Sequence, residues 1–157
     1  MKTNYLLPNS FKKIGWVIVA PIVVFIIISE FFDFQPEFPK VKVFAIATEG
    51  INNVAWFKII KDDISNEVLG ILLIVGSIFV AFSKEKNEDE LISKIRLESL
   101  VWATYINYIA LVLMMLFVYD IAFFSVLIFN LFTILIFFII RFNWAVYRFK
   151  KSALNEE

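Results

Sequence analysis

Uncharged amide and hydroxyl side chains occur within the long apolar runs of this sequence, and they are the candidates for hydrogen bonding or solute binding there. Ser99 and Asn107 fall on one face of a helix, because the interval between them is two steps of four residues. Asn130 and Thr133 lie three residues apart in the next apolar run and share a face in the same way. In lipid, such side chains either hydrogen-bond a neighbouring helix or line a path for a neutral solute. We favour the packing role and keep the solute path as the alternative.

Depth along the helices predicts which of these side chains meet. Counted from residue 99, Asn107 lies about 12 Å into the third apolar run at the helical rise. Counted from residue 141, Thr133 lies about 12 Å deep and Asn130 about 16 Å deep in the fourth run. An Asn side chain can bridge that difference. We therefore predict that Asn107 faces Thr133 and Asn130.

Two charged residues bracket the same pair of runs. Glu98 precedes the third run and Arg141 follows the fourth, so the two residues lie at the same depth if the runs form a hairpin. We predict an interfacial ion pair between them. An exposed pair of this kind contributes about 0–1 kcal/mol.

Several classes of chemistry are excluded by composition. The chain has no Cys and no His, which excludes disulfides, thiolate nucleophiles, the usual haem and zinc sites, and imidazole catalysis. An acidic cluster at 85–90 lacks the spacing of a calcium loop, and we interpret it as a solvated helix start. No serine stands in a nucleophile-elbow pattern. We expect no enzyme activity, no catalytic residue, no metal and no cofactor.

The elements that position these residues follow from hydropathy. The chain has 157 residues, 61% hydrophobic, with a mean hydropathy of +0.80. Soluble domains contain about 45–50% apolar residues. A bilayer core about 30 Å thick needs about 20 apolar residues per helix. The sequence therefore predicts a single integral membrane domain over 1–157, an all-α bundle of four transmembrane helices at 14–32, 65–83, 99–119 and 121–140.

Charge distribution predicts the orientation. Lys and Arg together number 15, and eleven of them fall in the N-terminal segment, the loop 84–98 and the tail 141–157. The remaining four fall in the loop 33–64. Cytoplasmic segments carry the excess of basic residues, so both termini are predicted to be cytoplasmic. The formal net charge is zero, so the chain lacks the excess of basic residues that is typical of nucleic-acid-binding proteins.

The outer loop 33–64 allows two interpretations. Lys40 and Lys42 alternate with Val41 and Val43, which is the period of a half-exposed strand. The later run NNVAWFKII fits either a second strand, which would complete a β-hairpin, or an interfacial helix. We favour the hairpin.

Helix boundaries are predicted from capping signals. Ser65 is the expected N-cap of the second span. Asn87, three residues before Glu90, predicts that the third helix begins near Glu88 and projects into the cytoplasm. The aromatic and basic tail after residue 140 is expected to extend the fourth helix.

A resemblance extends over most of the chain. The stretch AFSKEKNEDELISKIRLESLVWATYINY, beginning at Ala81, and the later FNLFTILIFFIIRFNW resemble a group of small, uncharacterised, four-span inner-membrane proteins of Bacteroidota. Members are often encoded near a helix-turn-helix regulator. The resemblance implies a bacterial inner-membrane location and a regulatory or accessory role. It carries no catalytic residue over to this chain.

Two functions compete on these grounds. The first is a non-enzymatic accessory, sensory or regulatory membrane protein, which lies in the lipid bilayer and meets a protein partner at the cytoplasmic helix between Glu88 and Glu98. The alternative is a subunit of a small homo-oligomeric channel or transporter for a neutral or small solute, lined by Asn107 and Asn130.

Overall fold

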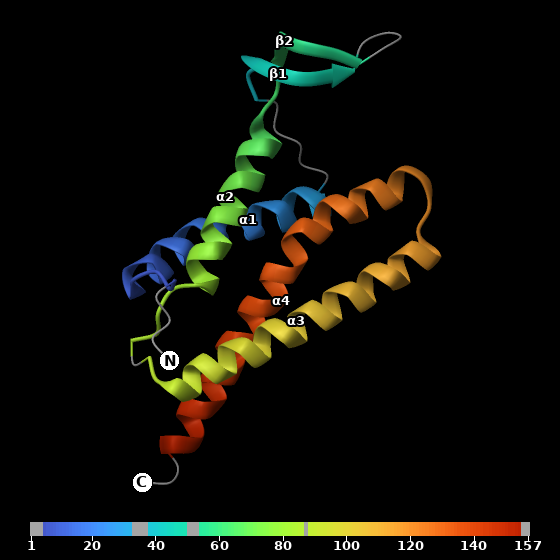
Figure 1. The fold of residues 1–157 in the computed structure, drawn as a ribbon. Helices are drawn as coiled ribbons and strands as arrows, with labels where there is room; N and C mark the ends of the chain where they lie inside the picture. Colours follow the sequence, from blue (N-terminus) through green and yellow to red (C-terminus); the bar gives the residue numbers. More distant parts are fainter. Residues whose placement is uncertain (1–4, 33–37, 50–53, 87, 155–157) are drawn as a thin grey trace.

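Four helices and a two-stranded hairpin make up the part of the chain that the structure, a computed structural model, describes (Figure 1). The described residues are 5–32, 38–49, 54–86 and 88–154. The elements in chain order are α1 (Asn9–Phe32), β1 (Val41–Glu49), β2 (Val54–Asp62), α2 (Ser65–Ala81), α3 (Glu90–Phe117) and α4 (Asp120–Leu154). The chain is therefore mostly helical, as its hydropathy predicts.

Three of the helices are long and apolar enough to cross a membrane. They are α1, α3 and α4, with 24, 28 and 35 residues. α2 is also apolar but has 17 residues. At the helical rise it is about 25 Å long, which is less than the bilayer core of about 30 Å. The membrane-protein class predicted from the sequence thus fits three long helices and one short one.

The predicted caps of α2 and α3 are corrected by the structure. Ser65 is the first residue of α2 and does not cap it; instead, Asp63 Oδ1 accepts hydrogen bonds from the Ser65 backbone N–H at 2.9 Å and from its hydroxyl. These bonds hold the pKa of Asp63 below its ordinary value of 3.8. The N-cap of α3 is Asp89, whose carboxylate accepts from the Ile92 backbone N–H at 2.7 Å. The predicted cap Asn87 lies outside the described residues.

A tight turn joins α3 to α4. Only Val118 and Tyr119 separate the two helices, and Asp120 begins α4 with φ at 57°. Asp is one of the few residues that tolerates this left-handed conformation. The helices run antiparallel, side by side, as the sequence predicts (Figure 1). α4 continues through the basic tail to Leu154, which also confirms the predicted extension.

Two glycines set the crossing of α1 and α2. A Cβ on Gly15 would lie 2.7 Å from the backbone oxygen of Gly76, and a Cβ on Gly76 would lie 2.8 Å from Val19 Cγ2. Both distances are shorter than real Cβ contacts. The backbones of the two helices therefore approach closely, which is how small residues promote helix packing in lipid.

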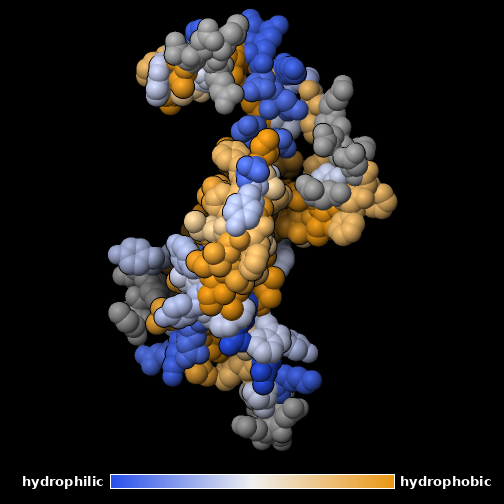
Figure 2. All heavy atoms as spheres, turned by 90° about the vertical axis from the view of Figure 1, so that its right-hand side faces the viewer, coloured by the Kyte–Doolittle hydropathy of each residue, from blue (hydrophilic) through white to orange (hydrophobic). Residues whose placement is uncertain are grey.

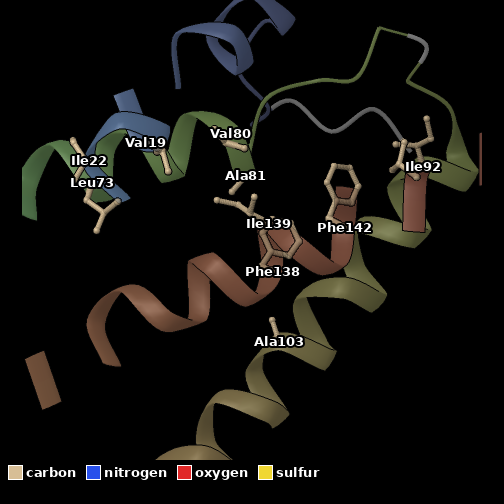
Figure 3. Packing of buried hydrophobic residues seen from close by; sticks show 11 residues of the cluster. Val19, Ile22, Leu73, Val80, Ala81, Ile92, Ala103, Phe138, Ile139 and Phe142 are labelled. Atoms are coloured by element: carbon tan, nitrogen blue, oxygen red, sulfur yellow. The ribbon is translucent and has the colours of Figure 1, made fainter. Parts of the chain in front are cut away.

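The α1–α2 pair meets the α3–α4 pair where α2 packs on α4. Figure 3 shows Ala81 of α2 facing Ile139 of α4, whereas Val80 lies against Gly15 of α1. Phe138 and Phe142 are fully buried, and the Phe82 and Phe138 rings stack at 5.6 Å between centroids. The hydrophobic core of the described chain thus lies at the end of α2 rather than along the middle of a closed bundle.

The loop between α1 and α2 forms the predicted β-hairpin. β1 and β2 pair antiparallel in a register that runs from Val41 opposite Asp62 to Glu49 opposite Val54. The hairpin interpretation of the outer loop is therefore confirmed, and the interfacial-helix alternative is wrong.

The molecule has two distinct ends. The start of α1, the segment between α2 and α3, and the last turns of α4 lie at one end, while the hairpin and the α3–α4 turn lie away from it (Figure 1). Hydrophobic side chains form a band over the helices between two hydrophilic regions (Figure 2). This is the surface pattern that suits a protein placed across a bilayer.

Candidate functional site

Five charged side chains gather at the end of the molecule where all four helices meet. They are Lys12, Glu85, Glu88, Arg96 and Lys150, and we call them the charge cluster. They come from α1, the segment after α2, α3 and α4. Buried charges are rare unless they are paired, so this group marks a specific structure.

Arg96 is the centre of the charge cluster and has an exposed fraction of only 8%. Its Nη1 donates to the backbone oxygens of Ala81 and Ser83, both at 3.1 Å. Its Nη2 donates to both carboxylate oxygens of Glu88 at 3.0 Å. The last carbonyls of a helix lack partners within the helix. Arg96 therefore caps the C-terminal end of α2 and ties that end to α3.

Glu85 forms the second half of the charge cluster. Its carboxylate pairs with Lys12 of α1 and lies 3.7 Å from Lys150 Nζ of α4. Its backbone N–H donates to Glu88 at 2.7 Å, which links it to the Arg96 half. Lys12 also donates to Asn143 Oδ1 of α4 at 3.0 Å. One buried carboxylate thus connects α1 with α4.

An aromatic ring lies beneath the cations. The Phe142 ring centroid is 4.6 Å from the Arg96 guanidinium carbon and 5.8 Å from Lys12 Nζ. The face of an aromatic ring attracts cations. Phe142 also stacks on Phe138, with ring centroids 5.7 Å apart, so the charge cluster rests directly on the hydrophobic core.

Backbone hydrogen bonds also join Leu7, just before α1, to the segment after α2. The Leu7 N–H donates to the Phe82 oxygen and the Lys84 N–H donates to the Leu7 oxygen, both at 2.9 Å. Asn9 Nδ2 donates to the Lys84 oxygen at 2.7 Å. Leu7 and Asn9, the first residue of α1, are thus bound to the segment that follows α2. Together with the charge cluster, these bonds fix the relative positions of the helices at this end.

Ser99, Asn107, Asn130 and Thr133, the uncharged polar residues predicted to lie within the spans, are brought together in part. Asn130 Nδ2 donates to Asn107 Oδ1 at 3.3 Å, so the predicted contact between these two amides is present. Ser99 and Asn107 are both buried on α3. Thr133 does not join them, because its hydroxyl donates to the Phe129 oxygen of its own helix at 2.8 Å. A threonine in a helix often satisfies its hydroxyl in this way.

The structure does not bring Glu98 and Arg141 together as the predicted ion pair. Arg141 instead lies over the rings of Trp102 and Trp144, at 5.7 and 5.1 Å, and Glu98 is exposed. Side chains lean toward the N-terminus of their own helix. In the antiparallel α3–α4 pair, this lean carries Glu98 and Arg141 in opposite directions along the helices. Trp102, one turn further along α3, takes the place beside Arg141.

Sequence reasoning missed the charge cluster. The acidic residues at 85–90 were expected to be solvated, yet Glu85 is buried and Glu88 is half-buried. A signal was present in the third helix, because the small and polar stripe through Ser99 and Asn107 reaches Arg96 when it is extended back by three residues. Charged residues on a buried stripe require partners, and the acidic segment before α3 supplied them.

A groove opens beside the charge cluster. Its volume is about 520 Å³, and it is lined by Phe82, Glu90, Ser93, Lys94, Arg96, Leu97, Leu100 and Phe138. Cationic and hydroxyl groups therefore lie next to an apolar floor. Within the described ranges, no group of three or more Asp, Glu, His or Cys side chains is placed to hold a metal ion.

Comparison of the chain with protein-family models, with curated proteins and with solved structures finds no match. The resemblance to four-span proteins of Bacteroidota therefore stays a prediction.

Proposed function

We propose that the protein is a non-enzymatic membrane protein of sensory or regulatory type, which passes the state of its β-hairpin to a protein partner on the other side of the membrane. In this proposal all four helices span a bacterial inner membrane. The N-terminus, the segment between α2 and α3, and the C-terminus are cytoplasmic. The β-hairpin is on the outer side.

The charge cluster is the observation that carries this proposal. The hairpin is joined to α2 by residues 63 and 64 alone, so α2 follows any movement of β2. The far end of α2 is bound through the Ala81 oxygen to Arg96. Glu88, the ion-pair partner of Arg96, also accepts a hydrogen bond from the Glu85 backbone N–H. The Glu85 carboxylate in turn contacts Lys12 of α1 and Lys150 of α4. A shift of α2 must therefore change contacts to every other helix, which is the physical requirement for coupling between distant sites.

Two observations support the proposed orientation. Ten of the 15 basic residues lie in described segments at the end that holds the charge cluster, in agreement with the excess of basic residues on cytoplasmic sides. The short length of α2 is compatible with a span, because a bilayer thins locally around a short helix at modest cost.

The groove beside the charge cluster supports a partner site at the helix between Glu88 and Glu98. Lys94 and Leu97 line it, and Leu97 is 63% exposed. The groove has an apolar floor that includes Phe82 and Leu100, with charged side chains beside it, which resembles the apolar core and polar rim of a protein interface. Any shift of Arg96 would change this groove, since Arg96 is part of its wall.

Photo-crosslinking in cells tests the proposal. A photoreactive residue replaces Lys94 in the groove, and the matched control replaces Lys151, which is exposed at the end of α4. We expect a discrete adduct with another protein from position 94 and none from position 151. The adduct yield should change when residues 41–62 are replaced by a flexible linker, and Arg96→Gln should abolish that response.

The proposal fails if position 94 gives no adduct, or if its adduct is indifferent to the hairpin. The alternative, a small channel or transporter subunit, relies on Asn107 and Asn130. Their amides bond to each other, which favours their packing role. Solute flux through liposomes that contain the purified protein, lost in Asn107→Leu at unchanged expression and thermal stability, would support the channel instead.

A further inference from the structure

One face of the β-hairpin carries four bulky apolar side chains. Phe44 lies opposite Ile59 in the register, and Ile46 and Phe57, two residues along each strand, follow on the same face. The Phe44 and Phe57 rings are 6.3 Å apart between centroids. The exposed fractions of the four side chains run from 60% to 74%. We call this set the apolar face of the hairpin.

The described helices leave this face uncovered. Neither strand packs against any helix within the described ranges. A two-stranded hairpin that stands alone in water is marginally stable at best and needs another surface against its hydrophobic side. Within the described residues no surface covers Phe44, Ile46, Phe57 and Ile59, so the hairpin needs a surface supplied from elsewhere.

Position and charge identify that surface. The hairpin ends next to the first turn of the apolar helix α2, since only two residues intervene between β2 and α2. The strands run across the end of α2 in Figure 1. Lys42 and Lys61 oppose each other at the base of the apolar face, and both are exposed. Aromatic and aliphatic side chains flanked by lysines are typical of segments that lie in a membrane interface.

We infer that the apolar face of the hairpin docks onto the phospholipid surface next to α2. The four apolar side chains enter the boundary between headgroups and acyl chains, and Lys42 and Lys61 contact lipid phosphates. A second copy of the chain fits this face less well. Two such faces packed together by a two-fold axis would bring four lysines into one interface, where like charges repel. Anionic lipid supplies the opposite charge. This inference goes beyond the proposed function and does not depend on a cytoplasmic partner.

Adjacent residues on β1 provide a matched test. The chain has no native Cys, so Ile46→Cys and Ala47→Cys can each carry a single environment-sensitive fluorophore. The two positions are neighbours, both are exposed, and they point to opposite faces of the hairpin. Each labelled full-length protein is placed, one copy per disc, in nanodiscs of mixed anionic and zwitterionic phospholipid. Spin-labelled lipid headgroups and aqueous acrylamide then serve as quenchers.

At position 46 we expect quenching by the spin-labelled lipid and loss of quenching by acrylamide. At position 47 we expect the reverse. With native Lys42 and Lys61, the lipid quenching at position 46 should rise with the fraction of anionic lipid in the discs. In the double variant Lys42→Gln/Lys61→Gln, this dependence on anionic lipid should be lost. Circular dichroism of each variant checks that the helices are intact.

Two outcomes overturn the inference. Equal access of acrylamide to positions 46 and 47 in the discs would mean that the apolar face is not docked. Protection of position 46 only in micelles that hold two copies, and its loss in single-copy discs, would make a second copy the occupant instead of lipid.

Discussion

Arg96 connects more separate parts of the chain than any other charged residue described here. A buried guanidinium is costly unless its charge is paired and most of its N–H groups have acceptors. The Arg96 Nε is buried without a hydrogen-bond partner, so its two Nη groups carry the pairing. Glu88 supplies the charge, and the Ala81 and Ser83 oxygens supply the acceptors. Loss of Arg96 would leave a largely buried carboxylate unpaired and two carbonyls without donors.

Arg96→Gln is therefore expected to destabilise the folded protein by about 3 kcal/mol, the lower end of the range for breaking a buried ion pair. Thermal unfolding in detergent or nanodiscs measures the change. Lys86→Gln is the matched control, because it removes the same charge from an exposed position in the neighbouring segment. Its effect should stay within about 0.5 kcal/mol. Equal stabilities of the two variants would show that the charge cluster does not hold the helices.

The amide contact within the α3–α4 pair should contribute much less. Asn107→Leu is expected to destabilise by about 0.6 kcal/mol and by no more than about 1.7, because separated helices in lipid find other hydrogen-bond partners. A double-mutant cycle with Asn130→Leu isolates the contact. Full additivity of the two substitutions would be incompatible with the 3.3 Å hydrogen bond between these side chains.

Acid should weaken the cap at the start of α2. The pKa of Asp63 is lowered chiefly by the hydrogen bond from the Ser65 hydroxyl. A lowered pKa in the folded state means that the carboxylate stabilises the fold above its unfolded pKa, and that this contribution is lost as the pH falls through the folded pKa. Ser65→Ala should raise the pKa of Asp63 toward 3.8, as measured by NMR titration of its carboxyl carbon. An unchanged titration in Ser65→Ala would contradict the cap.

At this scale the sequence predicts distance along a helix better than side-chain direction. Depth counting predicts that Asn107 faces both Thr133 and Asn130, and the structure forms only the contact with Asn130, whose amide reaches several ångströms. The same counting fails for Glu98 and Arg141, where the lean of each side chain along its helix decides the partner. Trp102 then competes for Arg141.

At the scale of elements, the contact between α1 and α2 depends on the absence of side chains. Gly15 and Gly76 let the two backbones approach, and the resulting pair carries the hairpin at one end and the charge cluster at the other. Gly70, also on α2, meets only Phe132 Cζ, and a Cβ there would lie at an ordinary 3.6 Å. The glycines of α2 thus have different roles.

Gly15→Ala is expected to destabilise the protein by about 1–3 kcal/mol, since overpacking must push the backbones apart. Gly70→Ala should be neutral or stabilise by up to about 1 kcal/mol through its better helix propensity. Unfolding in mixed micelles compares the two variants directly. The account of the α1–α2 crossing fails if both substitutions have the same sign and size.

Element type was predictable, and so was the pairing of neighbours joined by short turns, but the α1–α2 and α2–α4 contacts were not. Long apolar runs indicate helices in lipid, and the alternation of Lys and Val before residue 44 indicates a strand. In lipid, however, the faces that meet another helix and the faces that meet acyl chains are both apolar, so hydropathy does not separate them. Gly15 and Gly76 mark the contact, but they lie in different helices, so no spacing within one helix reveals it.

On the scale of the whole molecule, the chain consists of two helical pairs joined at one end. The α1–α2 pair carries the hairpin, and the α3–α4 pair carries the amide contact. The charge cluster and the aromatic core join the two pairs. A closed four-helix bundle was expected from four spans, yet α2 is the helix that bridges the two pairs. Its short length makes it the critical element of the proposed topology.

Cysteine accessibility from the two sides of the membrane tests that topology most directly. Single Cys residues at positions 47, 86 and 151 are exposed, and the chain has no native Cys. If all four helices span, an impermeant thiol reagent added outside intact cells should label position 47 and leave positions 86 and 151 unlabelled until the membrane is opened. If α2 does not span, positions 47 and 86 lie on the same side. Labelling of both positions from one side would contradict the four-span topology. It would also contradict the proposed coupling of the β-hairpin to the charge cluster through α2, which depends on that topology.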